Sequence, residues 1–223
     1  YGRRAWKPPG SSAFLSSHEL SFDALLCLFC ETKFPQHIEH VHLFSFSNFP
    51  NMDSSSSASK ATVKVVIING TKLLFVALSE ERTVVCYDFD SKAKLMEYSG
   101  HSLTISAIDV DVESQLLVSG SSDSTVRTWK ICSGAQLRKF SHNSVVTGLF
   151  VRESVLVSAG MDGSLHGCDI NSGATLWEKK YSGSVEGLTC DESGKYFACG
   201  SLSGEITVAN VVTGDVVFEN KNV

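Results

Sequence analysis

The sequence predicts an all-β protein assembled from repeated four-stranded antiparallel sheets, and three observations predict it. From Ala61 onward, apolar runs of about five to seven residues alternate with turn residues, the pattern of short strands. The pattern returns at intervals close to forty residues. All four prolines lie within the first 50 residues, so none interrupts a strand in the repeated part.

Two landmarks of the repeat recur in the same rhythm. The first is a strand–turn–strand segment whose last residue is Tyr87, Trp129, Cys168 or Ala209, at spacings of 42, 39 and 41. The second is a Ser-Gly or Thr-Gly turn at Gly134, Gly173 and Gly214, at spacings of 39 and 41. Because two separate markers share one irregular period, the repeat reflects structure and not chance composition.

The first unit shows best how each repeat folds. Val63–Ile68 and Leu73–Leu78 are joined by Asn69-Gly70, a strong signal for a type I′ hairpin turn. Thr83–Asp88 and Lys94–Tyr98 supply two further strands. Four antiparallel strands in about forty residues, repeated along the chain, describe the blades of a β-propeller. A β-sandwich with coincidental periodicity is the alternative.

The domain organisation follows from the same pattern. Four repeats are expected at about 61–98, 99–140, 141–181 and 182–223, and residues 1–60 are expected to be an irregular or disordered extension. The Ser-rich stretch from Met52 to Lys60 has too little apolar surface to fold alone. Met52 is a possible true start, which would make residues 1–51 upstream read-through.

The second and third repeats share a set of polar residues. Gly100-His101 opens the second repeat, which continues with Ser119, Asp123 and Trp129. The third repeat keeps the histidine, serine and aspartate but has Cys168 in place of tryptophan. This pattern resembles that of the WD40 family. The resemblance covers residues 61–223 and implies a buried hydrogen-bond network that fixes each entering loop to its blade. The implied network residues are His101, Ser119, Asp123, Trp129, His142, Ser158 and Asp162.

Catalysis by these residues is not expected. A His–Ser–Asp set is also found in hydrolases, but here the spacing recurs in a second repeat, and the serine lies within a strand and not on a sharp nucleophile turn. The fourth repeat has no histidine near Ser182 or Gly183, and the first repeat lacks one too. The sequence therefore predicts a structural network, with no catalytic residue and no cofactor.

Two other groups of residues are candidates for metal sites. The first group comprises Cys27, Cys30, His37, His40 and His42, whose spacing is too short for a common zinc finger. The second comprises Asp109 and Asp111, which alternate along a strand and are expected to be surface charge. No phosphate-binding glycine loop is present. No metal site is predicted.

The composition indicates which classes of molecule this protein binds and in which compartment. The net charge of −5 makes nucleic acid an unfavourable partner, and no apolar run is long enough to span a membrane. Seven cysteines, mostly in apolar runs, indicate buried free thiols in a reducing compartment, hence the cytoplasm or nucleus. Proteins or peptides are the expected partners, and no small-molecule substrate is expected.

The resemblance implies a non-catalytic scaffold or adaptor within a multi-protein complex. Since WD40 rings usually have seven blades, the four repeats are expected to belong to an incomplete ring, with about three blades missing after Val223 or replaced by partners or self-association. Val76–Val146 resembles the WD40 subunits of translation initiation factor 3, which makes a translation-initiation or ribosome-assembly subunit the narrower alternative. A propeller enzyme is the second alternative.

Overall fold

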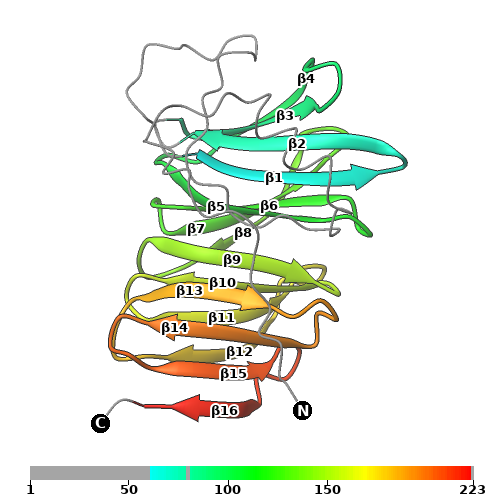
Figure 1. Ribbon diagram of the computed structural model, residues 1–223. Helices are drawn as coiled ribbons and strands as arrows, with labels where there is room; N and C mark the ends of the chain where they lie inside the picture. Colours follow the sequence, from blue (N-terminus) through cyan, green and yellow to red (C-terminus); the bar gives the residue numbers. More distant parts are fainter. Residues whose placement is uncertain (1–60, 79–80, 222–223) are drawn as a thin grey trace, which may run out of the picture.

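The computed structural model describes residues 61–78 and 81–221 of the chain. These residues form sixteen strands, without a helix among them, in four sheets of four antiparallel strands (Figure 1). Each sheet uses four consecutive strands, and we name the sheets blades 1 to 4 in chain order. The predicted all-β fold built from four-stranded units is confirmed.

The strands of each blade are as follows: blade 1, β1 (Ala61–Ile68), β2 (Thr71–Leu78), β3 (Thr83–Asp88) and β4 (Lys94–Ser99); blade 2, β5 (Ile105–Asp111), β6 (Leu116–Ser121), β7 (Thr125–Lys130) and β8 (Gln136–Ser141); blade 3, β9 (Val146–Arg152), β10 (Val155–Gly160), β11 (Ser164–Asp169) and β12 (Thr175–Lys180); blade 4, β13 (Val185–Cys190), β14 (Tyr196–Ser201), β15 (Ile206–Asn210) and β16 (Val216–Asn220).

Consecutive blades pack against each other through their first strands. β5 contacts both β1 and β9, and β9 also contacts β13. Blades 1 and 4 lie at opposite ends of the stack in Figure 1, so the described residues form an open arc and not a closed ring. The last strand of each blade, by contrast, forms the outer edge of its sheet.

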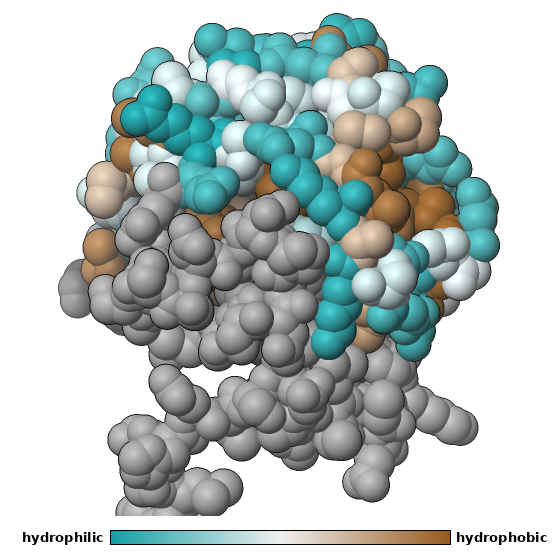
Figure 2. Space-filling model, turned by 90° about the horizontal axis from the view of Figure 1, so that it is seen from above, coloured by the Kyte–Doolittle hydropathy of each residue, from teal (hydrophilic) through white to brown (hydrophobic). Residues whose placement is uncertain are grey.

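The apolar core lies between the blades. Every residue of β6 and β10 is buried, whereas every residue of β16 is exposed. Burial of apolar surface between neighbouring sheets is therefore the main force that holds the stack together. Seen from the blade 1 end, the outer surface mixes hydrophilic and hydrophobic residues (Figure 2). Each interface has its own cluster, which includes Phe75 and Leu117 (blades 1 and 2), Val118 and Leu156 (blades 2 and 3), and Phe150 and Phe197 (blades 3 and 4).

Hydroxyl groups on the first strands add a polar link at each interface. Thr62 Oγ1 donates to the carbonyl of Ser106 at 3.3 Å, and Ser106 Oγ donates to the carbonyl of Val146 at 2.5 Å. Thr147 Oγ1 donates in the same way to the carbonyl of Val185 at 2.5 Å. Each blade thus satisfies a backbone acceptor of the next one.

The turn glycines Gly134, Gly173 and Gly214 have two reasons to be glycine. All three have positive φ, between 69° and 81°. Each also lies against a side chain from the outer strand of the preceding blade. A Cβ atom at these positions would come within 3.0 Å of Met96 Sδ, 3.1 Å of Arg138 Nη1 and 2.7 Å of Trp177 Cγ, respectively.

The expectation that Asp109 and Asp111 are surface charge is wrong. Asp109 is 2% exposed and Asp111 is 9% exposed. Asp109 Oδ1 lies 2.8 Å from Lys64 Nζ, and Oδ2 lies 2.8 Å from Arg152 Nη1. Asp109 Oδ2 also accepts the backbone N–H of Val151 at 3.0 Å. The carboxylate is buried because two cations from the adjacent blades compensate its charge.

Several expectations concern residues outside the described part. The Cys27–Cys30 and histidine group, the extension at residues 1–60 and the possible start at Met52 all lie there. Among the described cysteines, all of which are free thiols, Cys86, Cys168 and Cys199 are buried and Cys132 is exposed. The described residues contain no helix that is long and apolar enough to cross a bilayer.

Candidate functional site

One end of the stack gathers the loops that the network residues occupy. Because the strands alternate in direction, the links β4–β5, β6–β7, β8–β9, β10–β11, β12–β13 and β14–β15 all lie at the same end of their sheets. We call this end the loop face. It consists of residues 100–104, 122–124, 142–145, 161–163, 181–184 and 202–205.

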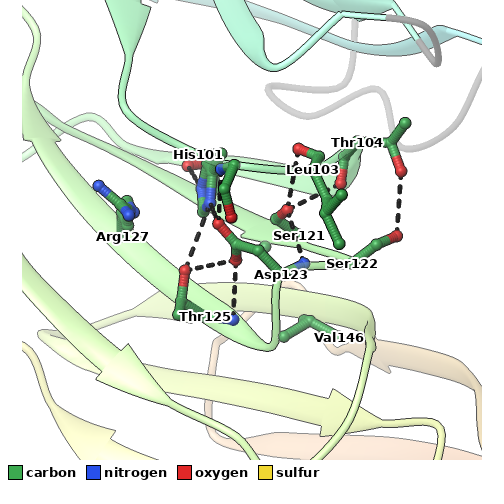
Figure 3. Close-up of polar contacts among 12 residues, drawn as sticks. His101, Leu103, Thr104, Ser121, Ser122, Asp123, Thr125, Arg127 and Val146 are labelled. Atoms are coloured by element: carbon green, nitrogen blue, oxygen red, sulfur yellow. Dashed lines mark hydrogen bonds and ion pairs between the residues drawn. The ribbon is translucent and has the colours of Figure 1, made fainter.

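Blade 2 carries the most complete network beneath this face. His101 Nδ1 lies 2.9 Å from Asp123 Oδ2, and His101 Nε2 lies 2.8 Å from Ser119 Oγ. The indole N–H of Trp129 donates to the same Ser119 oxygen at 2.9 Å. The structure therefore brings all four residues of this set together, and Figure 3 shows His101 directed at Asp123 and Thr125.

The protonation states of His101 and Asp123 allow both side chains to keep their hydrogen bonds, as a structural role requires. Burial lowers the pKa of His101, although the Asp123 carboxylate acts in the opposite direction. Burial alone would raise the pKa of Asp123, but hydrogen bonds from Thr125, Ser102 and His101 lower it well below the usual range. At neutral pH a neutral His101 therefore donates its Nδ1–H to an ionised Asp123 and accepts the Ser119 hydroxyl at Nε2.

Blade 3 contains a modified network. His142 Nε2 lies 2.7 Å from Ser158 Oγ, as in blade 2. Ser164 stands between His142 and Asp162: its Oγ lies 3.5 Å from His142 Nδ1 and donates to Asp162 Oδ1 at 2.6 Å. The ring of His166 stacks on that of His142 with centroids 4.4 Å apart. Burial and the neighbouring His166 lower the pKa of His142 to about 4.

Blade 4 holds substitute contacts, which the sequence did not predict. Tyr181 occupies the position of the histidine, and its hydroxyl accepts a hydrogen bond from the Cys199 thiol at 3.2 Å. Glu205 replaces the aspartate: its Oε2 accepts the backbone N–H of Ser182 at 3.0 Å and the Ser203 hydroxyl at 2.7 Å. Hydrogen bonds from Ser203 and Ser182 lower the pKa of Glu205 to about 2. The spacing of 39 residues between His142 and Tyr181 was the available signal.

The accessible side chains of the loop face are different from those of the networks. Leu103, Met161 and Leu202 are 48%, 57% and 74% exposed. Met161 and Leu202 occupy equivalent positions in blades 3 and 4, and their backbone N–H groups each donate at 2.8 Å to a carbonyl of the entering loop. These loops, which backbone hydrogen bonds fix in place, therefore keep apolar side chains exposed to solvent.

The same geometry offers little for catalysis. Ser119 is 0% exposed and Ser158 is 2% exposed, so a substrate cannot reach either hydroxyl beside its histidine. The described residues contain no group of three or more His, Cys, Asp or Glu side chains that could hold a metal ion. The networks fix the loops, and the exposed side chains of the loop face are mainly apolar or carry hydroxyl groups, with the amide of Asn143 among them.

Comparison with known proteins agrees with this architecture. Residues 92–130 match the family model described as "WD domain, G-beta repeat". The chain is 26% identical to eukaryotic translation initiation factor 3 subunit I of Aspergillus niger over 160 residues, which are 64% of this chain and 47% of that protein. It is 31% identical to the U3 small nucleolar RNA-associated protein 15 homolog of Xenopus tropicalis over 105 residues, 47% of this chain and 20% of that protein.

Solved structures show the same fold. A chain from the mitotic checkpoint complex superposes with a TM-score of 0.64 at 22% identity, covering 75% of this chain and 52% of that chain. The computationally designed Ika8 protein gives a TM-score of 0.63 at 23% identity, covering 74% and 50% of the two chains. The chain thus spans about half, or less, of the proteins it matches. The chain thus contains a WD40 repeat at residues 92–130, and its described residues have the WD40-type β-propeller fold.

Proposed function

We propose that this chain is a non-catalytic scaffold that docks other proteins or peptides on its loop face within a multi-protein complex. The observation that carries the proposal is the exposure of Leu103, Met161 and Leu202 on loops that hydrogen-bond networks hold in place. Rigid loops lose little conformational entropy when a partner binds, and the burial of exposed apolar side chains under the partner stabilises the complex.

The names of the relatives support the same class of function. They include a translation initiation factor subunit, a protein associated with the U3 small nucleolar RNA, and pre-mRNA-processing factor 19 of Bos taurus, which is 26% identical over 134 residues. We infer a place in the cytoplasm or nucleus. A translation-initiation or ribosome-assembly complex is the narrower form of the proposal, supported by the first two relatives.

Affinity purification with a matched pair of variants tests the proposal. Met161→Glu combined with Leu202→Glu places two charges on the loop face. Val212→Glu is the control, because Val212 is 47% exposed in the β15–β16 turn at the opposite end of the blade. We expect proteins that copurify with the unaltered chain to be lost about tenfold or more with the double variant and kept with the control.

Two outcomes would count against the proposal. Equal recovery of partners by the double variant would remove the loop face as the docking site. Recovery of partners that include no translation-initiation and no ribosome-assembly protein would remove the narrower assignment and leave the scaffold role. Circular dichroism of all variants checks that each one folds.

A further inference from the structure

The outer hairpin of blade 2, formed by β7 and β8, carries basic charges alone. Residues 125–141 include Arg127, Lys130, Arg138 and Lys139 and no acidic residue. The equivalent hairpins of blades 1, 3 and 4 carry three, two and two acidic residues. Since blades 1 and 3 flank blade 2 on both sides, the exposure of β8 does not depend on any further blade.

One cross-strand pair distinguishes this hairpin from the other three. Arg127 on β7 lies directly opposite Lys139 on β8. At the equivalent pair, each of the other blades has a glutamate on its outer strand: Val85 with Glu97, His166 with Glu178, and Thr207 with Glu219. Like charges directly opposite each other destabilise an antiparallel pair. Blade 2 therefore contains a repulsion that the other blades avoid, and an anion beside the pair would relieve it.

Both cations of this pair lack a counter-ion within the described residues. Arg127 Nη1 donates to Gln136 Oε1 at 2.5 Å, which holds the guanidinium in place, and the buried Nε of Arg127 has no hydrogen-bond partner among the described residues. Lys139 is exposed. No carboxylate in the described part of the chain forms an ion pair with either side chain. Two positive charges are thus left without compensation.

The edge of β8 adds main-chain groups to this charge. β8 pairs with β7 on one side, and no other described strand pairs with its second side. From Arg138 to Ser141 the pairing with β7 is regular, so an added strand meets regular backbone beside Lys139. An extended peptide binds such an edge through its own backbone, and its side chains then lie beside those of the edge strand.

We propose that β8 binds an extended acidic segment of a partner protein, which pairs with the free edge of β8 and places a carboxylate beside Lys139. An opposite charge next to Lys139 stabilises the added strand and offsets the repulsion from Arg127. Nucleic acid is the less favourable polyanion, because the net charge of −5 opposes its approach and Phe140, the aromatic residue of β8, is too buried for a base to stack on it. This surface is independent of docking on the loop face.

Fluorescence anisotropy with labelled synthetic peptides tests the proposal on the full 223-residue chain. One peptide alternates glutamate with valine, and the matched peptide alternates lysine with valine. We expect the acidic peptide to bind at least about tenfold more tightly than the basic one, and its binding to weaken as salt screens the charges. Absence of binding by the acidic peptide, or equal binding of the two peptides, would overturn the proposal.

Charge reversal within the pair tests the site itself. Lys139→Glu gives blade 2 the carboxylate that the other blades have. We therefore expect it to raise the melting temperature and to weaken binding of the acidic peptide at least about tenfold. Lys195→Glu is the control, because it makes the same change of charge at an exposed turn of blade 4 and should keep the binding. Loss of binding by both variants, or by neither, would contradict the site at β8.

Two further probes test the strand pairing and the class of partner. The acidic peptide with every backbone amide N-methylated keeps its charges but has no N–H to donate, so we expect it to bind at least about tenfold more weakly. Equal binding of the methylated peptide would overturn the strand pairing. Single-stranded oligouridylate of the same net charge should bind more weakly than the acidic peptide. Tighter binding of the oligouridylate, abolished by Lys139→Glu, would overturn the peptide as the partner.

Discussion

Asp109 connects three blades at a single carboxylate. It lies on β5, its cationic partners Lys64 and Arg152 belong to β1 and β9, and both Asp109 and Lys64 are buried. Burial alone would raise the pKa of Asp109, but the charges of Lys64 and Arg152 outweigh that effect and hold the pKa below its usual value. The carboxylate is therefore ionised at neutral pH.

Removal of the Asp109 charge should destabilise the folded protein. Asp109→Asn removes the counter-ion of the buried Lys64 and one partner of Arg152, and we expect the free energy of unfolding to fall by about 3–5 kcal/mol. Urea denaturation measures the loss. Asp90→Asn is the control, since Asp90 is exposed, and it should change stability by less than about 0.5 kcal/mol. Similar losses for the two variants would contradict the role given to Asp109.

His142 should make the fold sensitive to mild acid. Its folded pKa of about 4 is depressed from 6.5, so between these values the unfolded chain binds a proton that the folded chain does not. The contribution of His142 to the free energy of unfolding is therefore fully present above pH 6.5. It is lost as the pH falls toward 4, and the loss amounts to roughly 3 kcal/mol. Urea midpoints across this range check it. His142→Gln should flatten the pH dependence, and an unchanged slope would refute the assignment.

The residues of the networks could be predicted only where the usual residue types are kept. The resemblance to the WD40 family predicted His101, Ser119, Asp123 and Trp129, because their side chains match the family pattern. Tyr181, Cys199 and Glu205 could not, because a phenol, a thiol and a longer carboxylate reach the same points with different geometry. Asp109 escaped prediction for another reason: alternation shows which sheet face a residue occupies, but not which cations the neighbouring blade presents.

Strands and turns are the scale at which the sequence is most informative. The period of about forty residues predicted the four sheets, and Asn69-Gly70 predicted the turn between β1 and β2. The φ values of 50° and 81° at these two residues fit a type I′ turn. The packing of each outer strand on the next blade's turn glycine could not be predicted, because it joins residues from different repeats whose relative placement is set by stacking.

Gly214 offers a test of that packing. Gly214→Ala adds a Cβ atom 2.7 Å from Trp177 Cγ at a φ of 72°, whereas Gly70→Ala meets a similar φ of 81° with no atom within 4 Å. Both variants strain the backbone by about 1 kcal/mol. We expect Gly214→Ala to cost a further 1–3 kcal/mol, roughly, from the clash. Equal unfolding free energies for the two variants would show that the Trp177 contact adds nothing.

At the scale of the whole molecule, stability should decrease toward blade 4. Ile206 is 49% exposed, although its equivalents in blades 2 and 3, Val126 and Leu165, are 0% exposed. In repeat proteins each unit is stabilised by its neighbours, and blade 3 is the neighbour that covers blade 4 among the described residues. We expect amide hydrogens of β14 to exchange at least about tenfold faster than those of β10, measured by mass spectrometry. Uniform protection would contradict this gradient.

Because the four blades have similar shapes, one blade can pack beside the wrong neighbour while the chain folds. The position of Asp109 is occupied by Phe150 in blade 3 and by Thr189 in blade 4. A misordered stack would therefore separate the Asp109 carboxylate from Lys64 and Arg152. The ion triad thus favours the native order of the first three blades, because only that order brings both Lys64 and Arg152 to Asp109.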